Sequence, residues 1–276
     1  MVLRGVNVAG VEGAMRTAFV DSDNTAVPTC GIAVMAKASI PGRTKTRLVP
    51  PLTFEEAAQC NTAFLRDVAD NILTASARAS IAGYIAYGPA HSRPFFEATL
   101  HCEVALIEAC YPNFGDCLAC AIARLLERGH RAAVVLNSDS PTLPTSLLVE
   151  TAEVLARPGD RVVLGPALDG GYYLLGVKAE HHRLFQDIAW STEQVAHQTL
   201  ERAGELDLPV HVLPKWYDDD IAGLKMLQAE LFEGRSFAPE FCPAEPRYAR
   251  ALIQSLIETA DFKERLAFNA FQRAVE

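Results

Sequence analysis

Lysine and arginine side chains gather in one short segment of an otherwise acidic chain. The 276 residues include 25 Lys and Arg against 34 Asp and Glu, which gives a net charge of −9. Residues 37–48, called the basic loop below, hold no acidic residue and four cations: Lys37, Arg43, Lys45 and Arg47. Within this loop Pro41-Gly42 predicts a tight turn whose backbone N–H groups face outward. Cations beside free backbone N–H groups are what a polyphosphate requires, so the loop is a candidate nucleotide-phosphate site.

The spacing of the basic loop differs from the Gly-x4-Gly-Lys-Ser/Thr pattern of a Walker P-loop. A polyphosphate site here would therefore be of another kind, built on a glycine turn directly after a strand. The alternative is an ordinary solvated basic loop with no ligand.

Carboxylates follow two later apolar segments, where a divalent cation could be held against a phosphate. Asp139 comes just after residues 132–136, and Asp218, Asp219 and Asp220 come just after residues 210–213. Mg²⁺ typically takes one or two carboxylates and completes its shell with water and phosphate oxygens. Two alternatives remain open: Asp139 only caps a turn before Pro141, and the acidic triplet is a solvated turn before the next helix.

A glycine pair and a tryptophan supply a second group of candidates. Gly170 and Gly171 let the backbone approach a ligand closely, and Asp169 beside them could hold a hydroxyl or an amine. A plain β-turn explains Asp-Gly equally well. Trp190 precedes Ser191, which together with Gln194 predicts a capping box. Alternatively, Trp190 is only a packing residue ahead of a helix.

Short apolar strands that alternate with helices must position these residues. We expect strands at residues 31–36, 81–87, 132–136, 162–164, 172–175 and 210–213, and helices at 54–76, 118–128, from Pro144, 191–203, 221–232 and 248–260. This alternation indicates an α/β three-layer sandwich with a mostly parallel sheet covered on both faces. Ligands of such sheets bind at the carboxyl ends of the strands, where the loops after Ala36, Leu136 and Leu213 would meet.

The chain divides into three predicted parts. Residues 1–29 form an ill-ordered leader, 30–233 the α/β domain, and 234–276 a helical extension that packs on the core or on a second subunit of a homodimer. No apolar run reaches the roughly 18 residues that a membrane span needs. The acidic balance argues against nucleic acid or an anionic membrane as a partner.

Seven cysteines, an odd number, predict reduced thiols in a cytoplasmic protein. Cys102, Cys110, Cys117 and Cys120 lie close in the sequence, and the last two are one helical turn apart. A structural zinc ion usually needs two such cysteine pairs, so buried free cysteines are the preferred interpretation.

Four stretches in this order resemble the bacterial selenodomain-associated predicted glycosyltransferases, a branch of the nucleotide-diphospho-sugar transferase (GT-A) fold. They are residues 36–48, which include the basic loop, Ser138-Asp-Ser-Pro-Thr-Leu-Pro144, residues 164–176 and Trp190-Ser-Thr192. Lys45-Thr-Arg-Leu48 is also similar to phospholactate guanylyltransferases. Together these stretches lie within residues 31–231.

The resemblance implies roles for single residues. Lys45 and Arg47 would contact the nucleotide phosphates, with Lys37, Gly42 and Arg43 completing the nucleotide site. Asp139 would stand at the metal-binding aspartate of the fold, and counting back from Leu224 places the second ligand of Mg²⁺ (or Mn²⁺) at Asp219, with Asp218 or Asp220 as the one-residue alternatives. The acceptor side would be lined by Asp169, Gly170, Gly171 and Trp190.

The chain departs from the family pattern before the helix that precedes Asp139. The family carries Gly-x-x-Leu-Gly-x-Arg, whereas Gly115-Asp-Cys-Leu-Ala-Cys-Ala121 lacks the second glycine and the arginine. The expected function is a metal-dependent transfer from a nucleoside triphosphate or nucleotide-diphospho-sugar to a small acceptor, with Lys45, Asp139 and Asp169 as catalytic residues. Whether the transfer is nucleotidyl or glycosyl stays open, and a non-catalytic nucleotide-binding or scaffold protein is the alternative.

Overall fold

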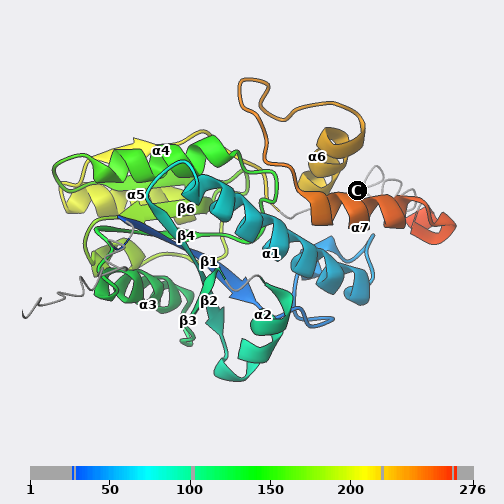
Figure 1. Ribbon diagram of the computed structural model, residues 1–276, viewed down its shortest axis with the longest axis horizontal. Helices are drawn as coiled ribbons and strands as arrows, with labels where there is room; N and C mark the ends of the chain where they lie inside the picture. The colour runs from blue at the N-terminus through cyan, green and yellow to red at the C-terminus, as the bar shows by residue number, and fades with distance from the viewer. Residues whose placement is uncertain (1–26, 28, 101–102, 219–220, 263, 266–276) are drawn as a thin grey trace, which may run out of the picture.

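The computed structural model describes residues 27, 29–100, 103–218, 221–262 and 264–265. The predicted leader, residues 1–29, lies outside the described residues except for Val27 and Thr29. A mixed sheet of seven strands runs through the centre of the molecule (Figure 1).

The strands of this sheet lie in the order β3-β2-β1-β4-β6-β5-β7. Their bounds are Cys30–Lys37 (β1), Ile81–Gly88 (β2), Ala105–Glu108 (β3), Ala132–Leu136 (β4), Val162–Pro166 (β5), Tyr172–Val177 (β6) and Val210–Val212 (β7). All neighbours pair in parallel except β6, which is antiparallel to both β4 and β5. The expected mostly parallel α/β sheet is confirmed.

Helices cover both faces of the sheet and divide the core into two clusters. The helices are α1 (Phe54–Ser76), α2 (Arg93–Thr99), α3 (Phe114–Glu127), α4 (Thr145–Ala156), α5 (Val195–Glu205), α6 (Ile221–Phe232) and α7 (Arg247–Ile257), with short 3-10 turns η1 (Thr46–Leu48), η2 (Ala90–Ser92) and η3 (His182–Phe185). One cluster contains residues of α1, α4, α6 and α7, and the other residues of α3, α5 and η3. In Figure 1 α4 and α3 accordingly lie on opposite sides of the sheet.

Local sequence signals account for the main elements. Thr53 and Glu56 form a reciprocal capping box at the start of α1, which satisfies backbone N–H groups that the first turn leaves free. All five residues of β4 are buried, because helices cover this strand on both faces. The central strands therefore carry continuous apolar sequence rather than alternation.

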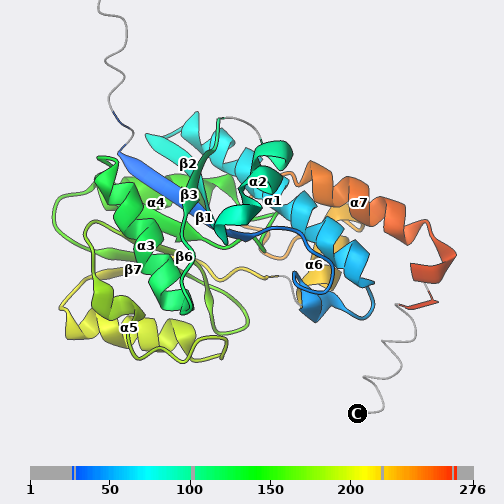
Figure 2. The ribbon, with the colours of Figure 1, turned by 90° about the horizontal axis from the view of Figure 1, so that it is seen from below.

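Helix α7 lies alongside α1, as both views show (Figures 1 and 2). The Asp67 carboxylate of α1 accepts the backbone N–H groups of Tyr248 at 2.9 Å and Ala249 at 2.8 Å. The first turn of α7 follows Pro246, which gives no side-chain cap, so Asp67 satisfies these donors from the neighbouring helix. The division into domains at residue 233 remains a prediction.

Three details differ from the sequence-based expectations. Strand β3 and helix α2 were not predicted, because β3 is a short edge strand of four residues and α2 has only seven. The capping box at Ser191 is wrong: α5 begins at Val195, and the Thr192 hydroxyl instead accepts the Gln194 N–H within a turn.

The prediction of buried cysteines is wrong for Cys110. Cys30 and Cys60 are buried and Cys117 and Cys120 half-buried, but Cys110 is exposed because it follows the edge strand β3. Cys102 lies outside the described residues. Among the helices that the structure describes, none has the length and apolar character of a membrane span.

The contact of Asp67 with α7 predicts a pH-dependent stability. Burial raises the pKa of Asp67 to about 6 from its ordinary 3.8, against the opposing effect of the two N–H donors. A raised folded-state pKa stabilises the fold at pH values below the unfolded pKa, and this contribution is lost as the pH rises through about 6. Relative to Asp67→Asn, wild type should lose about 1–3 kcal/mol of unfolding free energy between about pH 4 and about pH 7. Guanidinium unfolding at both pH values measures this, and an equal pH dependence of both proteins would refute it.

Candidate functional site

Four segments meet at the carboxyl edge of the parallel strands. The basic loop leaves the end of β1, Asp139 follows β4 and Asp218 follows β7. Because β6 runs antiparallel to β5, the turn between them, which holds Asp169, lies at this edge as well. The loops after β1, β4 and β7 therefore lie at the same edge, as predicted. The turn that holds Asp169 lies there too.

An ion pair joins the basic loop to the loop after β4. The Lys45 ammonium donates to Asp139 Oδ1 at 2.6 Å, and the Lys45 side chain is only 2% exposed whereas that of Asp139 is 34% exposed. The same nitrogen lies 4.5 Å from the centroid of the Phe64 ring of α1. A buried ammonium needs such partners, because leaving water costs several kcal/mol. Lys45 therefore does not lie in a solvated loop.

The backbone of Lys45 is in the left-handed region, with φ 49° and ψ 38°. This conformation costs a non-glycine residue about 1–2 kcal/mol. Strain of this kind persists only where surrounding contacts impose it, and it concentrates at binding sites. Here the contacts with Asp139 and Phe64 hold the side chain inward.

A second contact between opposite charges lies nearer the surface. Arg47 Nη1 is 3.5 Å from Asp169 Oδ2, and the Arg47 side chain is 58% exposed. The other carboxylate oxygen of Asp169 accepts the backbone N–H of Gly171 at 2.8 Å, which fixes the turn. Lys45 and Arg47 thus each face one of the predicted site carboxylates.

The loop after β7 is fixed to the loop after β4 by two buried aromatic residues. Trp216 donates from its indole nitrogen to the Thr142 hydroxyl at 3.3 Å, and the Tyr217 hydroxyl contacts the same Thr142 hydroxyl at 2.5 Å. Ser140 donates to the Tyr217 carbonyl oxygen at 2.9 Å. These bonds hold Asp218, the residue that follows, at the strand end beside Asp139.

Asp139 and Asp218 line the same small pocket, together with Leu48 and Phe64. Within the described residues no group of three or more potential metal ligands is found. Asp219, the predicted second ligand, and Asp220 lie outside the described residues. Mg²⁺ needs one or two carboxylates besides water and phosphate oxygens, so Asp139 and Asp218 are the described candidates for its ligands.

The remaining predicted residues of the basic loop lie further from Asp139 and Asp218. Lys37 is the exposed last residue of β1. Gly42 has φ +74°, as a tight turn requires, and the exposed Arg43 donates its backbone N–H to Ile40. The structure therefore places Lys45 and Arg47 against carboxylates and leaves Lys37 and Arg43 toward solvent.

Trp190 connects the Asp169 turn to helix α3. Its ring packs edge to face with Phe114 at 5.3 Å between centroids, and a Cβ on Gly115 would lie 2.9 Å from its indole. Three residues further on, the Glu193 backbone lies against Gly170, whose carbonyl oxygen accepts the Ala196 N–H. Trp190 is thus half-buried, and its acceptor role remains a prediction.

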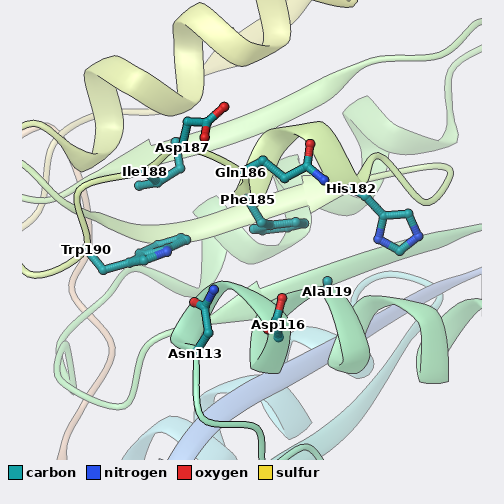
Figure 3. Close-up of a pocket in the computed structure, with 9 residues that line it drawn as sticks. All are labelled: Asn113, Asp116, Ala119, His182, Phe185, Gln186, Asp187, Ile188 and Trp190. Carbon is teal, nitrogen blue, oxygen red and sulfur yellow. The ribbon is translucent and has the colours of Figure 1, made fainter.

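A cavity of about 520 Å³ opens beside Trp190, between α3 and the chain from η3 to Trp190 (Figure 3). Its lining residues are Asn113, Asp116, Ala119, His182, Phe185, Gln186, Asp187, Ile188 and Trp190. In Figure 3 Asn113 and Asp116 point from α3 toward the side of the cavity formed by Phe185 and Trp190.

Sequence reasoning missed the residues that position the charges. They are Phe64 of α1 and the aromatic pair of Trp216 and Tyr217 before the acidic triplet. An aromatic pair directly before an acidic run is the signal that could have indicated a buried anchor. The cavity beside α3 has no such signal, because its residues come from separate segments.

Comparisons with known proteins agree with this fold. The model of a family described as an uncharacterized protein conserved in bacteria (DUF2064) matches residues 71–192, which contain Asp139, Asp169 and Trp190. The crystal structure of a candidate nucleotide-diphospho-sugar transferase from Desulfovibrio desulfuricans is similar with a TM-score of 0.72 and 25% identity, over 86% of this chain and 98% of that one. No curated protein sequence matches this chain.

Two further structures are more distant. CMP:2-keto-3-deoxy-manno-octonic acid synthetase complexed with CTP has a TM-score of 0.47 and 11% identity, over 75% of this chain and 100% of that one. A cytidylyltransferase from Leptospira borgpetersenii has a TM-score of 0.45 and 9% identity, over 85% and 96%. The similarity to the D. desulfuricans structure shows that the chain has the nucleotide-diphospho-sugar transferase type of α/β fold that the resemblance implied.

The packing of Gly170 predicts a local requirement for glycine. Gly170 has φ +87°, and a Cβ there would lie 2.2 Å from the Glu193 carbonyl oxygen. Gly170→Ala should lower the free energy of unfolding by about 1–3 kcal/mol and displace the Asp169 turn. Gly204→Ala is the control, since no atom lies within 4 Å of the added Cβ and an alanine in helix α5 should stabilise it. Chemical unfolding of both variants tests this. Equal effects of the two substitutions would contradict it.

Proposed function

We propose that the protein is a metal-dependent transferase that acts on a nucleoside triphosphate or a nucleotide-diphospho-sugar. The observation that carries the proposal is the buried contact of Lys45 with Asp139 at the carboxyl edge of the sheet, beside Arg47 and Asp169. The fold shared with the candidate nucleotide-diphospho-sugar transferase from D. desulfuricans supports it.

Charge balance explains why such a pair suits a polyphosphate. Without ligand, the Lys45 ammonium neutralises Asp139, the aspartate expected to bind metal. A nucleotide phosphate offers Lys45 a second anionic partner, and a divalent cation does the same for Asp139. When phosphate and metal bind together, Lys45 can leave Asp139 for the phosphate while Asp139 binds the metal. No buried charge is then left uncompensated. Neither ligand alone satisfies both side chains.

Each residue then has a definite role. Lys45 and Arg47 hold the phosphate oxygens and stabilise the negative charge that develops on the leaving group. Asp139 and the carboxylates of the loop after β7 would hold Mg²⁺ or Mn²⁺, which neutralises phosphate charge when bound. Asp169, fixed by the Gly171 N–H, orients the nucleophile of the acceptor. The protein supplies positioning and charge, with no covalent intermediate on the chain.

Two reaction types share these roles. In nucleotidyl transfer an acceptor phosphate attacks the α-phosphorus and pyrophosphate leaves, whereas in glycosyl transfer an acceptor hydroxyl attacks a sugar carbon and a nucleoside diphosphate leaves. Lys45 and Arg47 face the leaving phosphates in both reactions.

Replacement of Lys45 by a neutral side chain should lower the affinity for triphosphate and raise the affinity for Mg²⁺. Lys45→Met leaves an unbranched apolar side chain beside the Phe64 ring but removes a charged phosphate donor worth about 1.5–3 kcal/mol, so triphosphate affinity should fall roughly ten- to hundredfold. Mg²⁺ affinity in the absence of nucleotide should rise, because Asp139 loses its competing cation. Calorimetric titrations measure both constants.

Lys178→Met is the matched control for this experiment. Lys178 donates to the carbonyl oxygens of Arg157 and Gly159, away from the basic loop, so neither affinity should change. If Lys45→Met and Lys178→Met bind triphosphate equally well, Lys45 is not a phosphate ligand.

Asp139 should couple metal binding to nucleotide binding. Asp139→Asn keeps the side-chain shape and removes the charge, so the gain in triphosphate affinity on adding Mg²⁺ should disappear. Asp169→Asn should retain that gain, because Asp169 faces Arg47 and the acceptor side. Triphosphate is titrated into each variant with and without Mg²⁺, and the metal-dependent gain in affinity is compared between the two variants. A full metal-dependent gain in Asp139→Asn would leave Asp139 as a turn residue only.

A further inference from the structure

We propose that the cavity between α3 and the chain from η3 to Trp190 binds the acceptor, and that this acceptor is a polyhydroxylated compound without phosphate, such as a sugar. The cavity itself is a property of the fold, whereas its role as an acceptor site rests on the function proposed above.

Size and position favour this assignment. The cavity volume of about 520 Å³ suits a mono- or disaccharide, and small-molecule sites commonly measure about 300–1,000 Å³. Trp190 lines the cavity, and the segment that follows it rests on Gly170 through Glu193. Gly170 adjoins Asp169, which faces Arg47 of the basic loop. The cavity therefore connects, through Trp190 and Glu193, to the turn that would orient the reacting group of a bound molecule.

The charges of the lining residues disfavour a phosphorylated acceptor. The nine lining residues include Asp116 and Asp187 but no lysine or arginine. The nearby Arg183 is engaged by Asp187 and by Glu205, which lowers the pKa of both carboxyl groups. The imidazole of His182, the remaining lining group that could hold an anion, lies 3.5 Å from the Glu180 carboxylate. A phosphate group entering here would therefore meet carboxylates and no guanidinium or ammonium of the lining, the cations that recognise phosphate best.

The remaining lining groups match the faces of a sugar. The rings of Phe185 and Trp190 offer apolar surface for C–H groups. Asn113 accepts the Gly115 N–H through Oδ1 at 2.8 Å, which directs its amide nitrogen elsewhere as a donor. The Asp116 carboxylate and the Gln186 amide supply acceptors for hydroxyl groups. Apolar rings with a few polar groups are typical of a site for an uncharged polar ligand.

An uncharged polyhydroxyl acceptor favours one of the two reaction types. The acceptor hydroxyl oxygen would form a bond to the anomeric carbon of the donor sugar while the bond from that carbon to the nucleoside diphosphate breaks. The diphosphate leaves with the bonding electron pair, and the hydroxyl proton passes to the Asp169 carboxylate. The cavity thus points to glycosyl transfer onto a hydroxyl group rather than nucleotidyl transfer onto a phosphate.

Tryptophan fluorescence gives a direct test, because the chain has two tryptophans and Trp216 is fully buried. We would titrate the full-length protein with three pairs: glucose and glucose 6-phosphate, mannose and mannose 6-phosphate, and galactose and galactose 1-phosphate. At least one neutral sugar should cause a saturable change in emission that is absent in Trp190→Phe. In every pair that binds, the phosphorylated member should bind more weakly. A tighter phosphorylated member, or no saturable change with any sugar, overturns the proposal.

Variants of α3 distinguish an effect of the cavity on sugar binding from an effect of the overall negative charge of the protein. Asp116→Ala should weaken binding of the neutral sugar about tenfold or more, as loss of a charged hydrogen-bond acceptor does. Glu127→Ala, at the other end of the same helix and paired with Arg124, should leave sugar binding unchanged. Asp116→Lys should improve binding of the phosphorylated member. Equal sugar affinities of Asp116→Ala and Glu127→Ala would refute the role of Asp116 and with it the cavity as the site.

Nucleotide binding is measured on the same samples, so the two proposals fail separately. Triphosphate binding with Mg²⁺ but no sugar binding overturns the acceptor assignment and leaves the proposed function intact. Saturable sugar binding without any nucleotide binding overturns the proposed function and retains the cavity only as a sugar site.

Discussion

The buried ammonium of Lys45 is the constraint that the rest of the site satisfies. Its side chain is 2% exposed, so an opposite charge must lie within hydrogen-bond distance, and Asp139 supplies it at 2.6 Å. Phe64 adds the face of its ring from α1. Because the basic loop must reach inward to make these contacts, the Lys45 backbone takes the left-handed conformation. One ion pair thus fixes the loop after β1 to the loop after β4.

Other parts of the fold bring further charges to the same place. Strand β5 runs in the same direction as β7, so the turn that follows it, with Asp169, lies at the carboxyl edge as well. Trp216 and Tyr217 fill the core below this edge and bond to Thr142, which sets the position of Asp218. Burial and the bond to Glu230 raise the pKa of Tyr217, so its hydroxyl remains a donor near neutral pH. Buried aromatic packing therefore fixes the loop that carries Asp218, whereas Asp139 and Asp169 are held by the cations of the basic loop and, for Asp169, by the Gly171 N–H.

The sequence predicted the fold well because its strands are short continuous apolar runs separated by amphipathic helices. It also predicted which loops meet, since parallel strands end at one edge of a sheet. It did not show which cation of the basic loop is buried, because Lys45 and Arg43 have the same local surroundings in sequence and differ only in their contacts with Phe64 and Asp139. The capping box at Ser191 failed because contact of Glu193 with Gly170, remote in sequence, governs the start of α5. Such long-range contacts leave no mark on local sequence patterns.

We infer that the pair of Lys45 and Asp139 is the unliganded state of a site that opens for metal and polyphosphate together. A crystal structure of the protein with Mg²⁺ and a non-hydrolysable nucleoside triphosphate tests this most directly. We predict that Lys45 Nζ moves from Asp139 to a phosphate oxygen and that Asp139 faces the metal. Nucleotide and metal bound elsewhere, with Lys45 Nζ still 2.6 Å from Asp139 Oδ1, would contradict the account.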